Sequence, residues 1–228
     1  TLVIRDITER RKSEERRDFL NTLLRQDLRS KNQTVQGYLH LLNDIDLPAE
    51  HEEYLRRAVK AGRESNEILK IAGKLREIEE TNWVAEMEVP EIIDHAIDDI
   101  SELIEGDGVE IENNVLDDIG RVKGDYSLNT LFSQILKTRI RTAKSGEIKI
   151  NAEKNQNSIL LIIEDNGESL PEDIKNLISG EVYKGKTTGS AGVLYYTISE
   201  IAEHNNANIE VRDTELGGAR FDIFLEKA

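Results

Sequence analysis

The chain has 228 residues, no cysteine, and a net charge of −15 from 45 acidic and 30 basic side chains. The lack of cysteine excludes disulfides, cysteine-type zinc sites and thiol catalysis, and the acidic balance argues against a surface for nucleic acid or anionic lipid. No apolar stretch approaches the roughly 20 residues that span a bilayer, and no secretory signal is present. We therefore expect a soluble protein of the cytoplasm.

Residues 1–82 are highly charged and predict a hairpin of two long helices. Residues 43–47 form the connection, and Pro48 stands where a first helical residue tolerates proline. Each helix has one apolar stripe with little in the chain to cover it, which favours pairing of two hairpins into a four-helix bundle. A hairpin folded back on the rest of the chain is the alternative. Apolar residues recur at helical spacing at Leu20, Leu24, Leu28, Val35, Leu39 and Leu42, and at Leu55, Val59, Leu69, Ala72 and Leu75.

After Trp83 the pattern mixes helices and strands and predicts a two-layer α/β sandwich. Helix signals include Pro90 at an entry, and Asp125 or Ser127 near a cap. Strand signals include a hairpin around residues 153–157 and a closing pair joined by Gly217 and Gly218. The predicted helices are 89–103, 126–144 and about 193–204, and the predicted strands are 109–115, 147–152, 158–163, 208–212 and 220–225.

Two short motifs in this second part indicate a nucleotide pocket. Residues 184–192 read KGKTTGSAG, whose small side chains, Lys and Thr allow backbone N–H groups and cations to surround phosphate oxygens. About twenty residues earlier, Asp165, Asn166 and Gly167 end an apolar strand. A buried carboxylate there can accept a hydrogen bond from the amine of a nucleobase. Separately, each motif is an ordinary loop or turn, but their order favours one pocket.

Over nearly its whole length, the chain resembles the cytoplasmic part of a sensor histidine kinase of a two-component system. IRDITERRK, from residue 4, is similar to the end of a PAS domain and the start of a signalling helix. RQDLRSKNQTVQGYLHLL, from residue 25, resembles the dimerisation and phosphoacceptor helix of archaeal-type members. Residues 165–171 and 184–196 resemble the glycine boxes and lid of the ATP-binding domain.

The resemblance implies a domain plan and a set of ligands. Residues 1–15 would end the PAS domain, 16–82 would form the dimerising helical hairpin, and 83–228 the ATP-binding sandwich. ATP and Mg²⁺ are the implied cofactors, and a response-regulator receiver domain and a second copy of the chain are the implied partners. The chain would be cytoplasmic, or the cytoplasmic part of a membrane-bound sensor. The implied nucleotide-binding residues are Gln134, Thr138 (also as metal ligand), Arg141, Asp165, Gly167, Lys184, Lys186, Gly189 and Gly192.

The acceptor position departs from this family. The family phosphorylates a histidine that precedes an acid, and here that place holds Gln26, followed by Asp27. A glutamine amide nitrogen lacks the free lone pair of imidazole and does not attack phosphate. Asp27 would orient or deprotonate the acceptor, but it has nothing to activate. His40 lies on the same helix without a following acid and is expected to be a packing or surface residue.

The ATP-binding part departs as well. Gln134 and Thr138 stand at the two asparagine positions that serve Mg²⁺, and Arg139 replaces a small residue beside the metal position. Ser169 and Leu194 stand at glycine positions, and a leucine restricts the backbone where phosphate should approach. A threonine hydroxyl can still ligate Mg²⁺. We expect ATP to bind more weakly than in a competent kinase, with little help from Mg²⁺.

The sequence therefore favours the signalling core of a histidine kinase that does not autophosphorylate at the usual place. Gln26 is either an engineered change or part of a drift towards a signalling pseudokinase. A phosphatase role, using Asp27 and Ser30, is an alternative. So is a dimeric scaffold that binds a response regulator without chemistry, which need not bind ATP. A free-standing ATPase of the related chaperone and topoisomerase superfamily is disfavoured by the PAS-like start and the helical hairpin.

Overall fold

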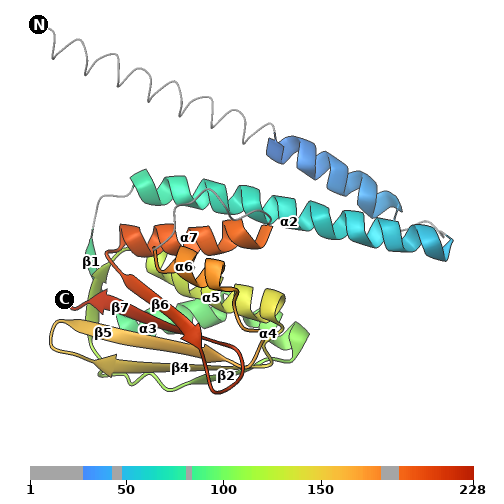
Figure 1. Cartoon of the computed structure of the whole chain (residues 1–228). Coiled ribbons are helices and arrows are strands. Elements are labelled where there is room, and N and C mark those ends of the chain that lie inside the picture. The colour runs from blue at the N-terminus through green and yellow to red at the C-terminus, as the bar shows by residue number, and fades with distance from the viewer. Residues whose placement is uncertain (1–27, 43–47, 81–83, 181–189) are drawn as a thin grey trace, which may run out of the picture. The chain divides into compact units, whose positions relative to one another are not determined.

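The computed structural model describes residues 28–42, 48–80, 84–180 and 190–228 (Figure 1). These divide into two compact units, with the boundary between Lys74 and Leu75. The predicted domain limits after residues 15 and 82 both fall on residues outside the described ones and stay predictions. Within the described part, no helix combines the length and the apolar character needed to cross a membrane.

The first unit holds two helical segments that contact each other. Residues 28–42 are helical, and α2 (Ala49–Glu80) follows and continues past the unit boundary at Lys74. Gly62 on α2 has no side chain, so the side chain of Gln36 approaches its backbone, and Gln36 Nε2 donates to the Gly62 carbonyl at 2.9 Å. One turn away, Asn32 Nδ2 donates to Asn66 Oδ1 at 2.8 Å. The connection 43–47 lies outside the described residues, so the hairpin and its pairing with a second copy stay predictions.

The second unit is built on a mixed five-stranded sheet of order β2-β4-β5-β7-β6. β4 and β5 form the predicted hairpin, and β7 pairs antiparallel with both β5 and β6. β1 and β3 form a separate antiparallel pair. The strands are β1 (Ala85–Glu88), β2 (Glu110–Asn113), β3 (Arg121–Gly124), β4 (Glu147–Lys154), β5 (Ser158–Asp165), β6 (Asn208–Asp213) and β7 (Ala219–Glu226).

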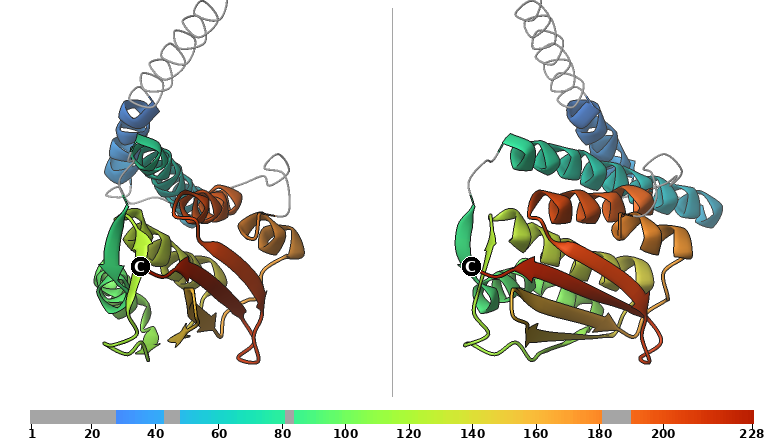
Figure 2. Two further views of the ribbon diagram at one scale, coloured as in Figure 1. Left: turned by 90° about the vertical axis from the view of Figure 1, so that its left-hand side faces the viewer. Right: turned by 60° about the vertical axis from the view of Figure 1, so that its left-hand side comes forward.

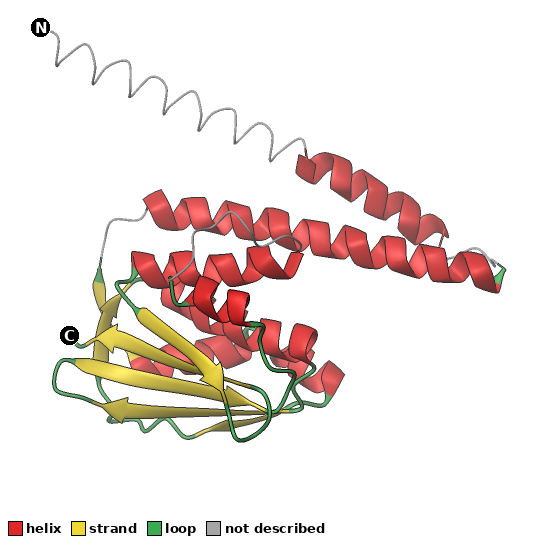
Figure 3. Ribbon diagram, viewed as in Figure 1, coloured by secondary structure: helices red, strands yellow, loops and turns green. Residues whose placement is uncertain are grey.

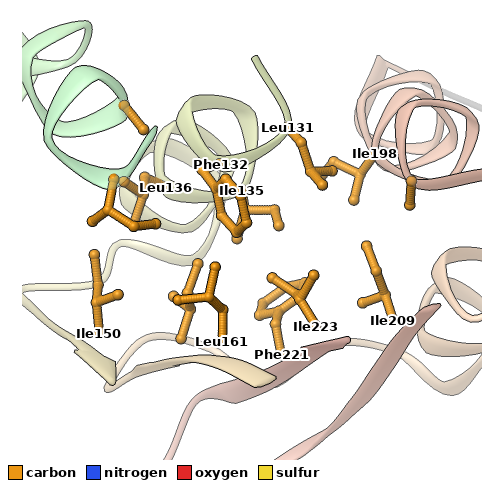
Figure 4. Close-up of a cluster of buried hydrophobic side chains, with 14 of the residues drawn as sticks. Leu131, Phe132, Ile135, Leu136, Ile150, Leu161, Ile198, Ile209, Phe221 and Ile223 are labelled. Carbon is orange, nitrogen blue, oxygen red and sulfur yellow. The ribbon is translucent and has the colours of Figure 1, made fainter. Parts of the chain in front are cut away.

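Helices cover one face of this sheet and give the predicted two layers (Figures 2 and 3). The helices of this unit are α3 (Val89–Asp98), α4 (Ser101–Asp107), α5 (Ser127–Ala143), α6 (Glu172–Ile178) and α7 (Ser190–His204). α5 lies between α3 and α7 and has the most buried apolar face. Figure 4 shows Leu131, Phe132 and Ile135 of α5 facing Leu161 of β5 and Phe221 of β7, all fully buried. Apolar residues at helical spacing on α5 thus meet alternate residues of the strands, which is the core of the domain.

The structure corrects several details of the predicted elements. The expected helix 89–103 is two helices, because Ile100 leaves the helical conformation (φ −117°, ψ 8°) and turns its side chain into the core. β2 pairs with β4 in parallel, a pairing that the sequence did not predict. The chain between them contains β3 and α5, and a crossover of this length permits parallel pairing. The β1–β3 pair and α6 were not predicted, since short elements carry too few residues to show a period.

Polar contacts around Asp125 hold the start of α5 against the end of α7. Tyr126 is the cap residue, and the predicted candidates Asp125 and Ser127 flank it. Asp125 Oδ1 accepts from the Ser127 N–H at 2.8 Å, and its Oδ2 lies 2.9 Å from Nε2 of His204. Asn205 accepts from the Asp125 N–H at 3.0 Å and donates to the Ser127 hydroxyl at 2.7 Å. Every one of these groups is buried or partly buried, so the network fixes how α5 and α7 enter the helical layer.

Candidate functional site

The predicted base end of the pocket lies where β5 leaves the sheet. β5 is an apolar strand whose last residue, Asp165, is fully buried. The turn that follows is held by Asn166, whose Oδ1 accepts from the N–H groups of Gly146 (2.9 Å) and Glu147 (3.0 Å) at the start of β4. The turn is therefore fixed to the α5–β4 corner, and the Asp165 side chain lies beneath it among buried residues.

Four hydrogen-bond donors surround the Asp165 carboxylate. Oδ1 accepts from Arg139 Nη2 at 3.0 Å, from the Ser145 hydroxyl at 2.8 Å and from the Gly167 N–H at 2.8 Å. Oδ2 accepts from Arg139 Nε at 2.6 Å. Three of these donors converge on Oδ1 and one, Arg139 Nε, binds Oδ2. The arrangement satisfies a charge that would otherwise be costly to bury.

Arg139 supplies two of those donors from the C-terminal part of α5. Its side chain is 1% exposed, as buried as the apolar residues around it. Besides Asp165, its Nη2 donates to the Glu168 carbonyl at 2.6 Å, and its Nη1 lies 3.5 Å from the Tyr195 hydroxyl on α7. The planar guanidinium matches the two carboxylate oxygens, which is the geometry that favours arginine over lysine. The pair joins α5, the end of β5 and α7.

Burial and charge shift the pKa values of this cluster. Burial lowers the pKa of Arg139, but hydrogen bonding to Asp165 and the charge of that carboxylate outweigh burial, and the net pKa is raised. The pKa of Tyr195 is raised by burial, although the hydrogen bond and positive charge of Arg139 oppose the shift. Arg139 therefore stays charged and Tyr195 neutral at physiological pH.

Two glycines allow the backbone to close over Asp165. A Cβ on Gly218, in the turn before β7, would lie 2.8 Å from the Asp165 carbonyl carbon. A Cβ on Gly167 would lie 2.6 Å from the Ala143 carbonyl oxygen. Both distances are too short for any side chain, so glycine is required by the close approach and not by an unusual φ.

The other predicted residues of the described part lie on α5 and α7. Thr138 is 3% exposed, and its hydroxyl donates to the Gln134 carbonyl of its own helix at 2.7 Å. Gln134 is half-buried and Arg141 is exposed on the same helix. Gly192 is buried in the first turn of α7.

Two departures from the family pattern also have defined places. Ser169 is exposed, and its hydroxyl donates to the Gly217 carbonyl at 3.3 Å. Leu194 is half-buried on α7. No group of three or more His, Asp or Glu side chains in the described part is arranged to hold a metal ion.

Five predicted residues lie outside the described part of the chain. They are Gln26, Asp27, Lys184, Lys186 and Gly189, so the acceptor position and the phosphate end stay predictions. His40 and Ser30 are described, and both are exposed on the helical segment 28–42.

Sequence reasoning missed Ser145, Tyr195 and Gly218 as members of the Asp165 cluster. It identified Arg139 as an unusual residue but gave it no partner. A signal for that partner exists in the sequence, because an arginine on the apolar face of a helix must find a buried acid or carbonyl. The sequence alone does not say which acid, since Arg139 and Asp165 are 26 positions apart.

Comparison with known families identifies this part of the chain. Residues 125–228 match the profile of the family described as "Histidine kinase-, DNA gyrase B-, and HSP90-like ATPase". This segment therefore resembles the ATPase domains of that family. The match begins at Asp125, just before α5, and includes the whole Asp165 cluster. It supports the resemblance to the ATP-binding domain of sensor histidine kinases that the glycine boxes indicate.

The chain also resembles a sensor protein over nearly its full length. It is 24% identical over 237 residues to the "Alginate biosynthesis sensor protein KinB" of Pseudomonas aeruginosa, and the match covers 98% of this chain. The chain spans 39% of the length of that relative.

Solved histidine kinase structures share the fold. A structure of the Acinetobacter baumannii histidine kinase AdeS superposes with a TM-score of 0.58 at 16% identity, covering 88% of this chain and 97% of that one. Full-length ShkA in complex with AMPPNP gives a TM-score of 0.59 at 16% identity, covering 91% of this chain and 46% of that one. The catalytic domain of histidine kinase ThkA gives 0.53 at 20% identity, covering 64% of this chain and 99% of that one. At these identities the likeness concerns the fold alone.

Proposed function

We propose that this chain is the signalling core of a two-component sensor histidine kinase whose acceptor position holds Gln26. The observation that carries the proposal is the ATPase-family domain at residues 125–228, which follows a helical unit in a chain similar to a sensor protein along 98% of its length. In this proposal the helical unit forms the dimer and contains the acceptor position, residue 26. The binding partner is the receiver domain of a response regulator. ATP with Mg²⁺ is the cofactor that the resemblance to histidine kinases implies.

The exposed apolar residues of the helical segment 28–42 support dimerisation. Leu28, Val35 and Leu42 are 52%, 51% and 43% exposed, and they are seven residues apart. A seven-residue apolar repeat is the pattern with which helices pack against one another. Within the described part, α2 contacts this segment through Asn32 and Gln36, so the repeat remains available for a second copy of the chain.

Gln26 defines what the proposed core does with ATP. Without an imidazole, phosphoryl transfer to position 26 has no nucleophile. Asp27 remains as the acid that would have oriented it. We therefore expect the chain to bind a receiver domain but not to supply it with phosphate.

Incubation with labelled ATP and Mg²⁺ tests this function. The chain should stay unlabelled, and Gln26→His should acquire an acid-labile, base-stable phosphate if the nucleotide site is competent. The matched control is Gln26→His combined with His40→Gln, which should label equally because His40 is not the acceptor. Label on the unmodified chain that disappears with His40→Gln alone would refute the assignment of position 26.

The Arg139–Asp165 pair favours a second candidate, a pseudokinase or dimeric scaffold that binds a receiver domain without kinase chemistry. Asp165 is the residue proposed to select the adenine amine, and in the structure both of its carboxylate oxygens already accept hydrogen bonds from the protein, two of them from Arg139. Nucleotide calorimetry discriminates the two candidates. A kinase core requires ATP binding, whereas a scaffold binds the receiver domain and gives no heat with ATP.

A further inference from the structure

The Asp165 cluster differs from an ordinary buried ion pair in its place in the fold. The carboxylate ends β5 at the turn assigned above to base recognition, and the arginine comes from the helix that precedes β4. A buried pair is seldom needed for stability, because well-packed apolar residues usually serve as well. The position of the pair therefore calls for an explanation beyond packing.

The hydrogen-bonding chemistry supplies that explanation. The amine of an aminopurine would donate to Asp165, and Arg139 already donates to both of its oxygens, at 2.6 and 3.0 Å. Asp165 is 0% exposed and Arg139 is 1% exposed, so neither presents surface to a ligand. A base could reach the carboxylate only by displacing the guanidinium, which would leave a positive charge buried without its partner.

We infer that Arg139 is an internal occupant of the base end of this site, holding the position on Asp165 that the amine of an adenine base would take. The inference rests on the proposed function, in which Asp165 is the base-selecting residue. The site is then regulated from within the chain, because Arg139 closes the base pocket. The chain transmits its signal without nucleotide.

The other contacts of Arg139 show that it is held in this place. Glu168 accepts from Nη2 at 2.6 Å, directly after the turn, and Tyr195 lies 3.5 Å from Nη1 on α7. Three separate elements thus fix one guanidinium. Ser145 and the Gly167 N–H complete the Asp165 shell and would remain if Arg139 were removed. Removing the arginine side chain should therefore expose an acceptor that is already oriented.

The experiment compares adenosine with inosine in full-length protein. Arg139→Ala vacates the pocket and leaves Asp165 needing a donor, which adenosine provides through its amine. Inosine has a carbonyl oxygen at that position and serves as the ligand control. We expect wild type to show no thermal stabilisation by either nucleoside. Arg139→Ala should bind adenosine at least about tenfold more tightly than wild type does, and about tenfold more tightly than it binds inosine, as one hydrogen bond to a charged group provides.

Arg139→Lys is the matched control, because it keeps a cation beside Asp165. It should gain little or no adenosine binding. If Arg139→Ala does not fold, Arg139→Ala with Asp165→Asn vacates the same space without an unpaired charge and should bind adenosine more tightly than wild type does. Folding of each variant is checked by circular dichroism.

Two results would overturn the inference. One is tight binding of adenosine or ATP by the wild-type chain. The other is a folded, vacated variant that gains no adenosine binding. Neither result decides the proposed function, which is tested separately by binding of a receiver domain. Labelling of Gln26→His with Arg139 in place would also count against the inference, because it requires ATP in the site. Conversely, a gain of adenosine binding in a chain that binds no receiver domain would count against the proposed function and not against this inference.

Discussion

The guanidinium of Arg139 lies against the carboxylate of Asp165, with Nε 2.6 Å from Oδ2 and Nη2 3.0 Å from Oδ1. Both side chains are almost completely buried. The contact joins the C-terminal part of α5 to the end of β5, at the turn that the sequence predicts as the base end of a nucleotide pocket. The stability of the domain and the proposed recognition of a base therefore depend on the same two residues.

Breaking this pair from either side should destabilise the protein strongly. Arg139→Met or Asp165→Asn alone should lower the free energy of unfolding by about 3–5 kcal/mol, because each leaves a buried charge without its partner. The double substitution should cost less than the sum of the singles by about 1–3 kcal/mol. Urea unfolding of the four proteins, followed by circular dichroism, measures this coupling. Additive losses would mean that the two charges do not depend on each other.

Tyr195 should ionise above the range of free tyrosine, which is about pH 10. Burial raises its pKa, so the neutral form is favoured in the folded protein, and the resulting stability is present below about pH 10 and lost as the pH rises through the folded pKa. Ultraviolet titration of phenolate formation should show a late phase that Tyr195→Phe removes. Arg139→Met should move that phase to still higher pH, since the cation beside the phenol lowers its pKa. An earlier phase in that variant would contradict the assignment.

Gly218→Ala should destabilise the domain, because its Cβ would lie 2.8 Å from the carbonyl carbon of Asp165. We expect a loss of about 1–3 kcal/mol in the free energy of unfolding, as overpacking usually costs. Gly146→Ala is the matched control, since nothing lies within 4 Å of a Cβ at that position. It should change stability by no more than about 0.5 kcal/mol. Equal effects of the two substitutions in urea unfolding would argue against the close approach.

The helical unit should make the chain a homodimer at micromolar concentration. Light scattering should give about twice the monomer mass of 25.9 kDa, and residues 84–228 alone should be monomeric. Val35→Glu places a charge in the exposed seven-residue repeat and should shift the mass towards the monomer. Lys31→Glu, at an exposed position of the same helical segment, is the control and should leave the dimer intact. A monomer mass for the unmodified chain would refute the prediction.

Short-range sequence patterns predicted most of the helices and strands. The apolar spacing of α5, the alternation in β4, the apolar run of β5 and the paired closing strands are properties of short segments, so the sequence alone was sufficient to find them. The same holds for Asp165 at the end of an apolar strand. Gln26 is likewise a property of one position, although its structural setting lies outside the described residues.

Contacts between distant segments were decided only by the tertiary structure. The parallel pairing of β2 with β4 depends on how the chain crosses between them, and the break before α4 depends on where Ile100 finds its place in the core. The partner of Arg139 was likewise decided only by the tertiary structure. The sequence requires that a buried arginine be paired, because an isolated charge in the interior is too costly. Only the packing of α5 against the sheet brings it to Asp165, 26 residues away, and so turns a predicted base-recognition residue into one half of an internal ion pair.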